Sequence, residues 1–159
     1  MSELQFVDTR FDPNLTQFHD LARQMAAAFG HTADLALDSE LAQLLRLRVA
    51  QQNGCAYCLI LHSKKARDIG IAESRVDNLG AWWQSRLYSD AERAALAYSE
   101  ALTDGNSPGF QSRHDVLTAH FSQREIAEIA AIVINMNVWT RLKLAQGATP
   151  RLVEETAVK

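Results

Sequence analysis

The sequence predicts an all-α protein, a compact multi-helix bundle in a single domain over residues 1–159. Apolar residues recur at helical spacing through most of the chain, and helix-capping patterns separate the segments. No convincing alternating strand pattern and no internal repeat interrupts them. A chain of 159 residues that is 47% hydrophobic is suited to one domain with a substantial core.

The N-terminal half predicts three helices. The first begins at Asp12-Pro13, because aspartate caps a helix and proline fits its first turn, and it ends at Gly30. The Asn53-Gly54 break separates the next two, which are expected over about residues 38–52 and 55–69.

The C-terminal half predicts a short helix from Ser74 and two longer ones. Each longer helix follows a Ser-x-x-Glu capping box, at Ser89–Glu92 and at Ser122–Glu125. The second of these is the longest helix and is expected to end near Gly147. Residues 104–109 form the clearest loop.

Composition excludes several classes of function. The net charge is −3 with no basic stripe, so nucleic acid is not an expected partner. No stretch reaches the ~18 apolar residues of a membrane span, and no secretory signal is visible, so a cytoplasmic protein is expected. Disulfides in that compartment are usually transient and catalytic, not structural.

Cys55 and Cys58 are the only cysteines, and His62 follows one helical turn later. Two thiols at this spacing can close a disulfide, and an imidazole one turn on can move a proton. All three fall on the apolar stripe of the predicted helix. The cysteines occupy its first turn, where free N–H groups and the helix dipole favour a thiolate. We expect Cys58 to be the more acidic thiol, because it lies nearer His62.

Other interpretations of the cysteine pair compete with redox chemistry. A buried cysteine can be merely a small hydrophobe, and a zinc site would need four ligands. Covalent haem would need histidine in the place of Leu59, and a thioredoxin would need a strand before the motif. No glycine-rich phosphate loop is present, so no cofactor and no metal are expected. The remaining histidines have no paired spacing: His19, His31, His114 and His120.

The run from Leu44 to Cys58, followed by His62, resembles the carboxymuconolactone decarboxylase superfamily, specifically its alkylhydroperoxidase AhpD-core (peroxidase-related) branch. The likeness covers roughly residues 15–145. It continues at Trp82-Trp83, Tyr88–Ala97, Ser99–Thr103 and Asn137–Arg141. The resemblance implies an all-helical homo-oligomer, commonly a trimer or hexamer. It also implies reduction of organic hydroperoxides through a dithiol/disulfide cycle that an unidentified dithiol reductant restores.

The resemblance also implies a role for each site residue. Cys58 matches the peroxidatic cysteine, Cys55 its resolving partner that meets the external reductant, and His62 the histidine of the proton relay. The family relay usually includes a glutamate twelve residues before the first cysteine, where this chain has Gln43. Glutamine can orient the imidazole but cannot carry a proton. Glu40, one turn earlier, is either a substitute in the relay or a solvated acid of the helix start.

Other residues near the motif also bear on the site. Some alkylhydroperoxidases carry histidine between the cysteines, where this chain has Tyr57. Arg46 and Arg48 are predicted to form a salt-bridging face, with binding of an anionic substrate as the alternative. The tryptophans are predicted to be core or subunit-interface residues: Trp82, Trp83 and Trp139.

The sequence therefore predicts a thiol-dependent alkyl hydroperoxide reductase. Two alternatives remain open. One is a non-enzymatic redox sensor that uses the dithiol as a switch. The other is a decarboxylase or lactone-processing enzyme of the same superfamily, a branch that does not need the cysteine pair.

Overall fold

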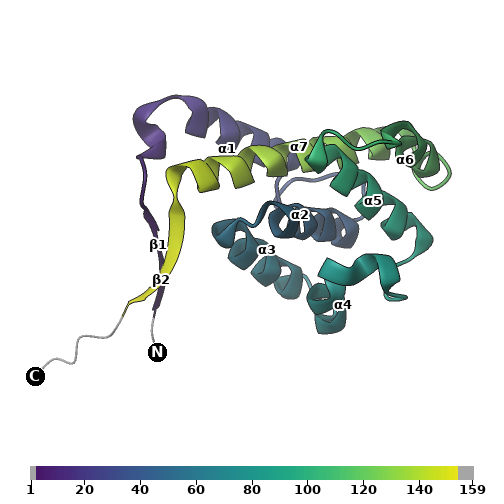
Figure 1. The fold of residues 1–159 in the computed structure, drawn as a ribbon, viewed down its shortest axis with the longest axis horizontal. Coiled ribbons are helices and arrows are strands. Elements are labelled where there is room, and N and C mark those ends of the chain that lie inside the picture. Colours follow the sequence, from purple (N-terminus) through teal and green to yellow (C-terminus); the bar gives the residue numbers. More distant parts are fainter. Residues whose placement is uncertain (1–2, 154–159) are drawn as a thin grey trace, which may run out of the picture.

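The computed structural model describes residues 3–153 as a helical body with a small sheet at one end (Figure 1). The helices are α1 (Phe18–Phe29), α2 (Ser39–Asn53), α3 (Ala56–Asp68), α4 (Glu73–Asn78), α5 (Asp90–Asp104), α6 (Phe110–Leu117) and α7 (Gln123–Gln146), with 3-10 turns at Pro13–Leu15 and Leu79–Gln84. The strands are β1 (Glu3–Asp8) and β2 (Ala148–Val153). The predicted helical class is thus correct for the body of the molecule.

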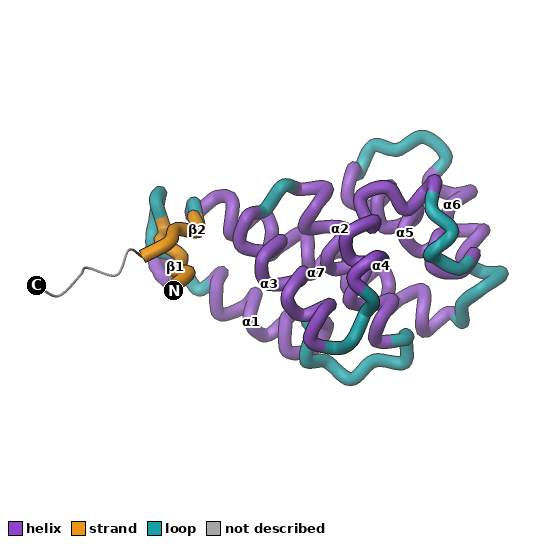
Figure 2. The backbone as a smooth tube through the Cα atoms, turned by 90° about the horizontal axis from the view of Figure 1, so that it is seen from below, coloured by secondary structure: helices purple, strands orange, loops and turns teal. Residues whose placement is uncertain are grey.

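The expectation of a purely helical protein is wrong at the two ends of the described chain. β1 and β2 pair antiparallel, with Phe6 opposite Pro150, and they project from the helical body (Figure 2). Each strand has only six residues, and proline in β2 lacks the N–H that a strand normally uses. Local patterning therefore misses a pairing that exists only once the fold brings the two ends together.

The first predicted helix is interrupted. The Asp12 side chain caps only the short turn Pro13–Leu15, and α1 begins after it at Phe18. The apolar side chain of Leu15 is 76% exposed, so no core contact extends the helix through this position. Helix α6 is not predicted from the sequence, because its N-cap residue is Gly109, which has no side chain to cap the helix.

The other helix boundaries agree with the predicted signals. Ser89 and Ser122 each accept a hydrogen bond from the backbone N–H three residues later, and the glutamate there accepts one from the serine N–H. Gly54 ends α2 in the left-handed conformation with φ of 62°. That tight turn places Cys55 directly at the start of α3.

Helix α2 lies at the centre of the body and packs against α3, α5 and α7. A small apolar cluster between α2, α3 and α7 holds both cysteines: Val49, Ala50, Cys55, Cys58, Val133 and Met136. The motif is therefore built into the core and not displayed on a surface loop.

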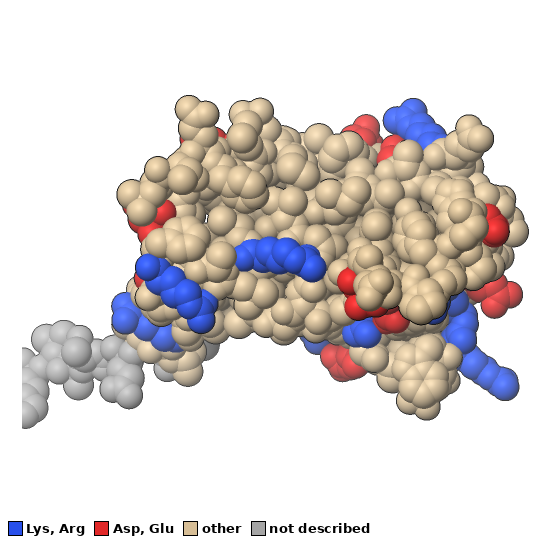
Figure 3. Space-filling model, turned by 45° about the horizontal axis from the view of Figure 1, so that its top comes forward, with Lys and Arg blue, Asp and Glu red and all other residues tan. Residues whose placement is uncertain are grey.

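The face of the molecule on the side of α1 and α7 has few charged side chains (Figure 3). Of the tryptophans predicted for the core or a subunit interface, Trp82 is buried and donates its indole N–H to Glu100, whereas Trp83 is exposed.

Within residues 3–153, none of the helices is both long enough and apolar enough to cross a bilayer.

Candidate active site

The two cysteines lie at the N-terminus of α3, and both are almost fully buried. Cys55 is the N-cap, in extended conformation, and its sulfur accepts a hydrogen bond from the backbone N–H of Cys58 at 3.3 Å. Both are free thiols, and their sulfurs are 2.7 Å apart. The predicted placement of the pair on the protein-facing side of the helix is confirmed.

Cys55 is the more acidic thiol. A hydrogen bond shared by two sulfurs can point either way, but the backbone N–H of Cys58 reaches the sulfur of Cys55. The ionised sulfur is therefore that of Cys55, and the Cys58 thiol donates to it. These hydrogen bonds lower the pKa of Cys55 to about 7, against the opposing effect of burial. The same pairing, together with burial, raises the pKa of Cys58.

This reverses the expectation that Cys58 would be the more acidic of the two. The expectation depended on a charged His62 close to Cys58. Burial, with smaller contributions from the charges of Arg46 and His31, lowers the pKa of His62 to about 3. The imidazole is therefore neutral at pH 7 and cannot ion-pair with a thiolate.

Gln43 holds the buried imidazole of His62 in place. Its Nε2 donates to the backbone carbonyl of His62 at 3.1 Å and lies 3.2 Å from Nδ1 of the ring. Its Oε1 accepts from Nη1 of Arg46 at 3.4 Å. Because the arginine fixes the amide oxygen and the carbonyl fixes the amide nitrogen, Nδ1 must be the acceptor. The neutral ring then carries its proton on Nε2.

Glu40 lies away from this group. Its carboxylate accepts from Nη1 of Arg75 at 2.9 Å, in a partly exposed ion pair that also includes Glu92. No hydrogen bond or ion pair joins Glu40 to His62 in the described part of the chain. The structure thus brings Cys55, Cys58, His62 and Gln43 together and leaves Glu40 in a surface contact.

A cavity of about 260 Å³ opens onto Cys58 and His62 but not onto Cys55. Its walls are mostly apolar and come from α1, α3, α7 and the turn after α1. The lining residues are Arg23, Ala26, Gly30, His31, Tyr57, Cys58, Leu61, His62, Asn135 and Trp139. A small molecule in this cavity reaches the sulfur of Cys58 first.

Two of these lining residues each carry a polar atom that has no hydrogen-bond partner within residues 3–153. These atoms are Oδ1 of Asn135 and Nε1 of Trp139, and both are buried. The two residues are four apart on α7, so they share one face of that helix. Asn135 is not predicted as a site residue from the sequence, and Trp139 is predicted only for the core or an interface, because nothing local connects α7 to the cysteines.

Lys143 is one turn further along the same face of α7. Its Nζ lies 4.5 Å from the ring centroid of Tyr57 and 5.6 Å from that of Trp139. The ammonium charge favours ionisation of both cysteines, and burial lowers its own pKa. The ring of Phe6 in β1 packs edge-on against Tyr57, with ring centroids 4.8 Å apart.

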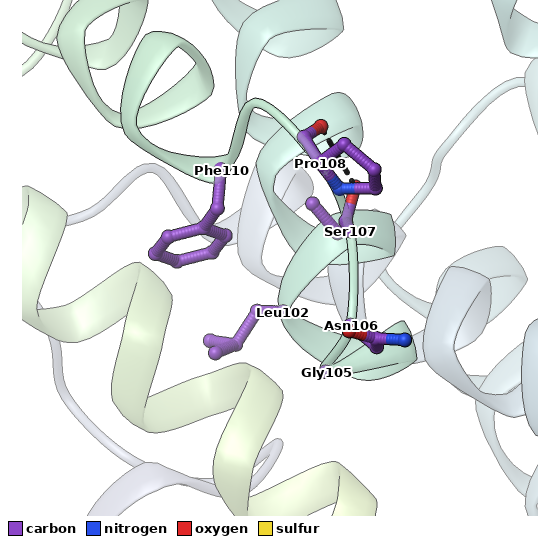
Figure 4. Close-up of a pocket in the computed structure, with 7 residues that line it drawn as sticks. Leu102, Gly105, Asn106, Ser107, Pro108 and Phe110 are labelled. Carbon is purple, nitrogen blue, oxygen red and sulfur yellow. Dashed lines mark hydrogen bonds between the residues drawn. The ribbon is translucent and has the colours of Figure 1, made fainter.

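Two other kinds of site, a metal site and a second cavity, offer no reactive group among residues 3–153. In the part of the chain that the structure describes, no group of three or more His, Cys, Asp or Glu side chains is arranged to hold a metal ion. A second cavity, of about 440 Å³, lies between the end of α5 and the start of α6 (Figure 4). Its lining includes Leu102, Ser107 and Phe110 but neither cysteine nor any titratable side chain.

Comparison with known families agrees with the fold and the cysteine pair. The model of the carboxymuconolactone decarboxylase family matches residues 20–101, which include α2, α3 and both cysteines. The chain belongs to this family. Two bacterial relatives are uncharacterized proteins. YdfG of Bacillus subtilis (strain 168) is 30% identical over 118 residues, which are 74% of this chain and 80% of YdfG. YnjA of Escherichia coli (strain K12) is 29% identical over 109 residues, which are 69% of this chain and 60% of YnjA.

Solved structures place this family member among AhpD-like proteins. ATU0492 of Agrobacterium tumefaciens, of unknown function and suggested to be the antioxidant defence protein AhpD, superposes with a TM-score of 0.82 at 26% identity. That match covers 92% of this chain and 99% of ATU0492. The debrominase Bmp8, a variant of which was crystallised in complex with 2,3,4-tribromopyrrole, has a TM-score of 0.68 at 25% identity. The Bmp8 match covers 83% of this chain and 67% of Bmp8.

Proposed function

We propose that this protein is a thiol-dependent reductase of small organic hydroperoxides. One observation carries the proposal: of two free thiols 2.7 Å apart, Cys58 lines an apolar cavity while Cys55 lies behind it. A nucleophile that faces the substrate and a second thiol ready to close a disulfide are the two parts that such a cycle needs. The likeness to ATU0492 supports the same activity.

The first step oxidises Cys58. Its sulfur attacks the terminal oxygen of the hydroperoxide, the O–O bond breaks, and a sulfenic acid and an alkoxide form. The proton that Cys58 gives up passes through the Cys55 thiolate, which lies within hydrogen-bond distance, to the alkoxide, which leaves as an alcohol. Nε2–H of His62 stabilises the developing oxyanion by a hydrogen bond and keeps its proton.

The second step closes the disulfide. The Cys55 thiolate attacks the sulfur of the sulfenic acid, and the departing hydroxide takes a proton from solvent to become water. One hydroperoxide is thereby reduced to alcohol and water at the expense of two thiols. A dithiol reductant then restores the pair by thiol–disulfide exchange. Cys55, which the family resemblance assigns to contact with the reductant, is only 1% exposed, whereas Cys58 is reached through the cavity.

Two residues of the cavity lining have polar atoms that are unpartnered within residues 3–153 and that suit the O–O–H group of such a substrate. Oδ1 of Asn135 can accept the O–H of a hydroperoxide, and Nε1–H of Trp139 can donate to one of its oxygens. The apolar walls suit the alkyl or aryl remainder. An uncharged organic hydroperoxide therefore matches this cavity better than hydrogen peroxide does.

Reductive dehalogenation is a second candidate, because the structure resembles the debrominase Bmp8 and aromatic side chains line the cavity. In that reaction Cys58 attacks the halogen, and the carbanion that leaves takes up a proton. Cys55 then displaces halide to give the same disulfide. The electron count is identical, so the substrate distinguishes the two activities.

The test is a coupled assay with cumene hydroperoxide, dithiothreitol and the purified protein. Wild type should consume peroxide catalytically, and Cys58→Ser should not. Cys55→Ser is the matched control: with hydroperoxide and without dithiothreitol, it should form no disulfide and should accumulate a Cys58 sulfenic acid that dimedone traps. Stoichiometric disulfide formation without turnover would favour the redox sensor, and turnover of a bromopyrrole alone would favour the dehalogenase.

A further inference from the structure

Among residues 3–153, Arg46 is a buried cation without a carboxylate partner. Its side chain lies in α2 and is 4% exposed. Nη1 donates to the amide oxygen of Gln43 at 3.4 Å, Nη2 donates to the carbonyl of Phe29 at 3.2 Å, and Nε has no partner in the described part of the chain. Within residues 3–153, no carboxylate oxygen lies within 4.0 Å of this guanidinium, whereas Arg48 pairs with Glu100 at 2.7 Å. The predicted salt-bridging face is therefore correct for Arg48 and wrong for Arg46.

An unpaired buried charge is costly, and arginine cannot avoid the cost by losing its proton. Burial lowers the pKa of Arg46 only to about 10, so the guanidinium remains charged at neutral pH. Its neutral neighbours, Gln43 and the carbonyl of Phe29, offer dipoles but no negative charge. Buried cations are normally balanced by an anion.

A cavity of about 150 Å³ lies beside this guanidinium. Its walls include three basic side chains, those of Arg46, Lys65 and His31, and apolar ones such as Leu37. Asp34 is the one carboxylate in the lining; it is exposed and forms no ion pair with Arg46 in the described structure. Since a water molecule occupies ~30 Å³, the cavity has room for a few waters or for one small anion.

We propose that this cavity binds a small monovalent oxyanion of the carboxylate or bicarbonate class, with Arg46 as its principal ligand. The guanidinium presents a planar fork that matches such an anion, and its Nε is free to donate. The anion supplies the negative charge that the amide of Gln43 cannot.

The position links this anion to the thiol site. His31 lines both cavities, and its ring centroid lies 6.2 Å from that of His62. Arg46 also reaches His62 through Gln43. Burial and, to a smaller extent, the charge of Arg46 lower the pKa of His62, so a bound anion that offsets this charge raises that pKa. An effect of the anion on turnover rests on the proposed hydroperoxide reduction. The binding itself does not depend on that function.

Binding is tested by thermal unfolding in sodium formate, with ionic strength held constant by sodium HEPES, whose anion is too large for the cavity. We expect the wild-type melting temperature to rise saturably, by roughly 3–6 °C at ten times the dissociation constant. Arg46→Met should abolish the rise. Arg48→Met, the matched control, removes a partly buried cation of the same helix, which pairs with Glu100, and should retain the rise.

Gln43→Glu is a second test variant, which serves if Arg46→Met does not fold. It places a carboxylate against the guanidinium, so it should raise the melting temperature by itself and remove the response to formate. No response of wild type to formate or bicarbonate would overturn the proposal, and so would an undiminished response in Gln43→Glu. Neither measurement involves a hydroperoxide, so failure of the peroxidase assay would leave this result standing.

Discussion

Gln43 donates its side-chain N–H to Nδ1 of His62 across 3.2 Å, and this contact fixes what the histidine can do. The imidazole is neutral, with its proton on Nε2, where it acts as a hydrogen-bond donor. A carboxylate in the place of Gln43 would accept from Nδ1 instead, and Nε2 would then become a base. One side chain thus decides between a histidine that stabilises an oxyanion and one that moves protons.

Gln43→Glu should therefore accelerate hydroperoxide reduction. A carboxylate beside His62 favours the charged imidazolium and restores base chemistry at Nε2. General acid–base help is typically worth ~10²–10⁴-fold, so a gain of at least ~10-fold is expected. Steady-state assays with an organic hydroperoxide measure it. Glu40→Gln is the control, since Glu40 pairs with Arg75, and its turnover should not change. A flat result for Gln43→Glu with a collapse for Glu40→Gln would instead assign the relay to Glu40.

The thiolate should form at Cys55. Ultraviolet absorbance of the thiolate against pH should give an apparent pKa near 7 for wild type, because the hydrogen bonds from Cys58 lower the pKa of Cys55 to about 7. Turnover should rise through the same pH. In Cys55→Ser, burial still raises the pKa of the remaining Cys58, so this thiol should titrate above the free value of ~8.5. His62→Ala should leave the wild-type value in place, since His62 is neutral. A pKa near 7 that survives in Cys55→Ser would return the acidic thiol to Cys58.

His62 should destabilise the fold in acid. Its pKa is about 3 when folded, against an ordinary 6.5, so below pH 6.5 the unfolded chain binds the proton first. The contribution of this group to the free energy of unfolding is therefore complete above pH 6.5, and it is lost as the pH falls towards 3. Between pH 7 and pH 4.5 this one group should remove roughly 2–3 kcal/mol of unfolding free energy. Urea unfolding at the two pH values should show a smaller loss in His62→Gln than in wild type. Equal losses would mean that the histidine is not buried in its neutral form.

Trp139 should contribute to substrate binding through its indole N–H. Trp139→Phe removes the donor and keeps a flat ring, so KM for an organic hydroperoxide should rise by roughly 3–10-fold, the worth of one hydrogen bond. The thiolate titration should stay unchanged. Trp83→Phe, at the exposed tryptophan, is the matched control. An equal effect of both substitutions would remove Trp139 from the cavity's function.

The chain is expected to form a homo-oligomer, a trimer or hexamer, through the weakly charged face of α1 and α7 (Figure 3). Phe18, Leu21 and Ile134 are each at least half exposed. Apolar side chains grouped in this way usually mark an interaction surface. Light scattering at micromolar concentration should give a multiple of the 17.7 kDa chain mass, and Phe18→Glu should lower it. Arg113→Glu, on α6, should not. A monomer mass for wild type would contradict the expectation.

Sequence by itself determined the local features of this protein. The capping boxes at Ser89 and Ser122 and the glycine at position 54 act within a few residues, so they predict helix limits without a fold. Helical periodicity likewise put Cys55, Cys58 and His62 on one buried stripe, because their relation is fixed by a single helix.

Only the tertiary structure decided how distant segments meet around that stripe. It paired β1 with β2, brought Asn135, Trp139 and Lys143 of α7 to the thiols, and turned Glu40 towards Arg75. It also buried Arg46 without a carboxylate and made Cys55 the acidic sulfur. These outcomes depend on burial and on hydrogen bonds between elements far apart in the chain, and neither quantity is present in a local pattern of residues.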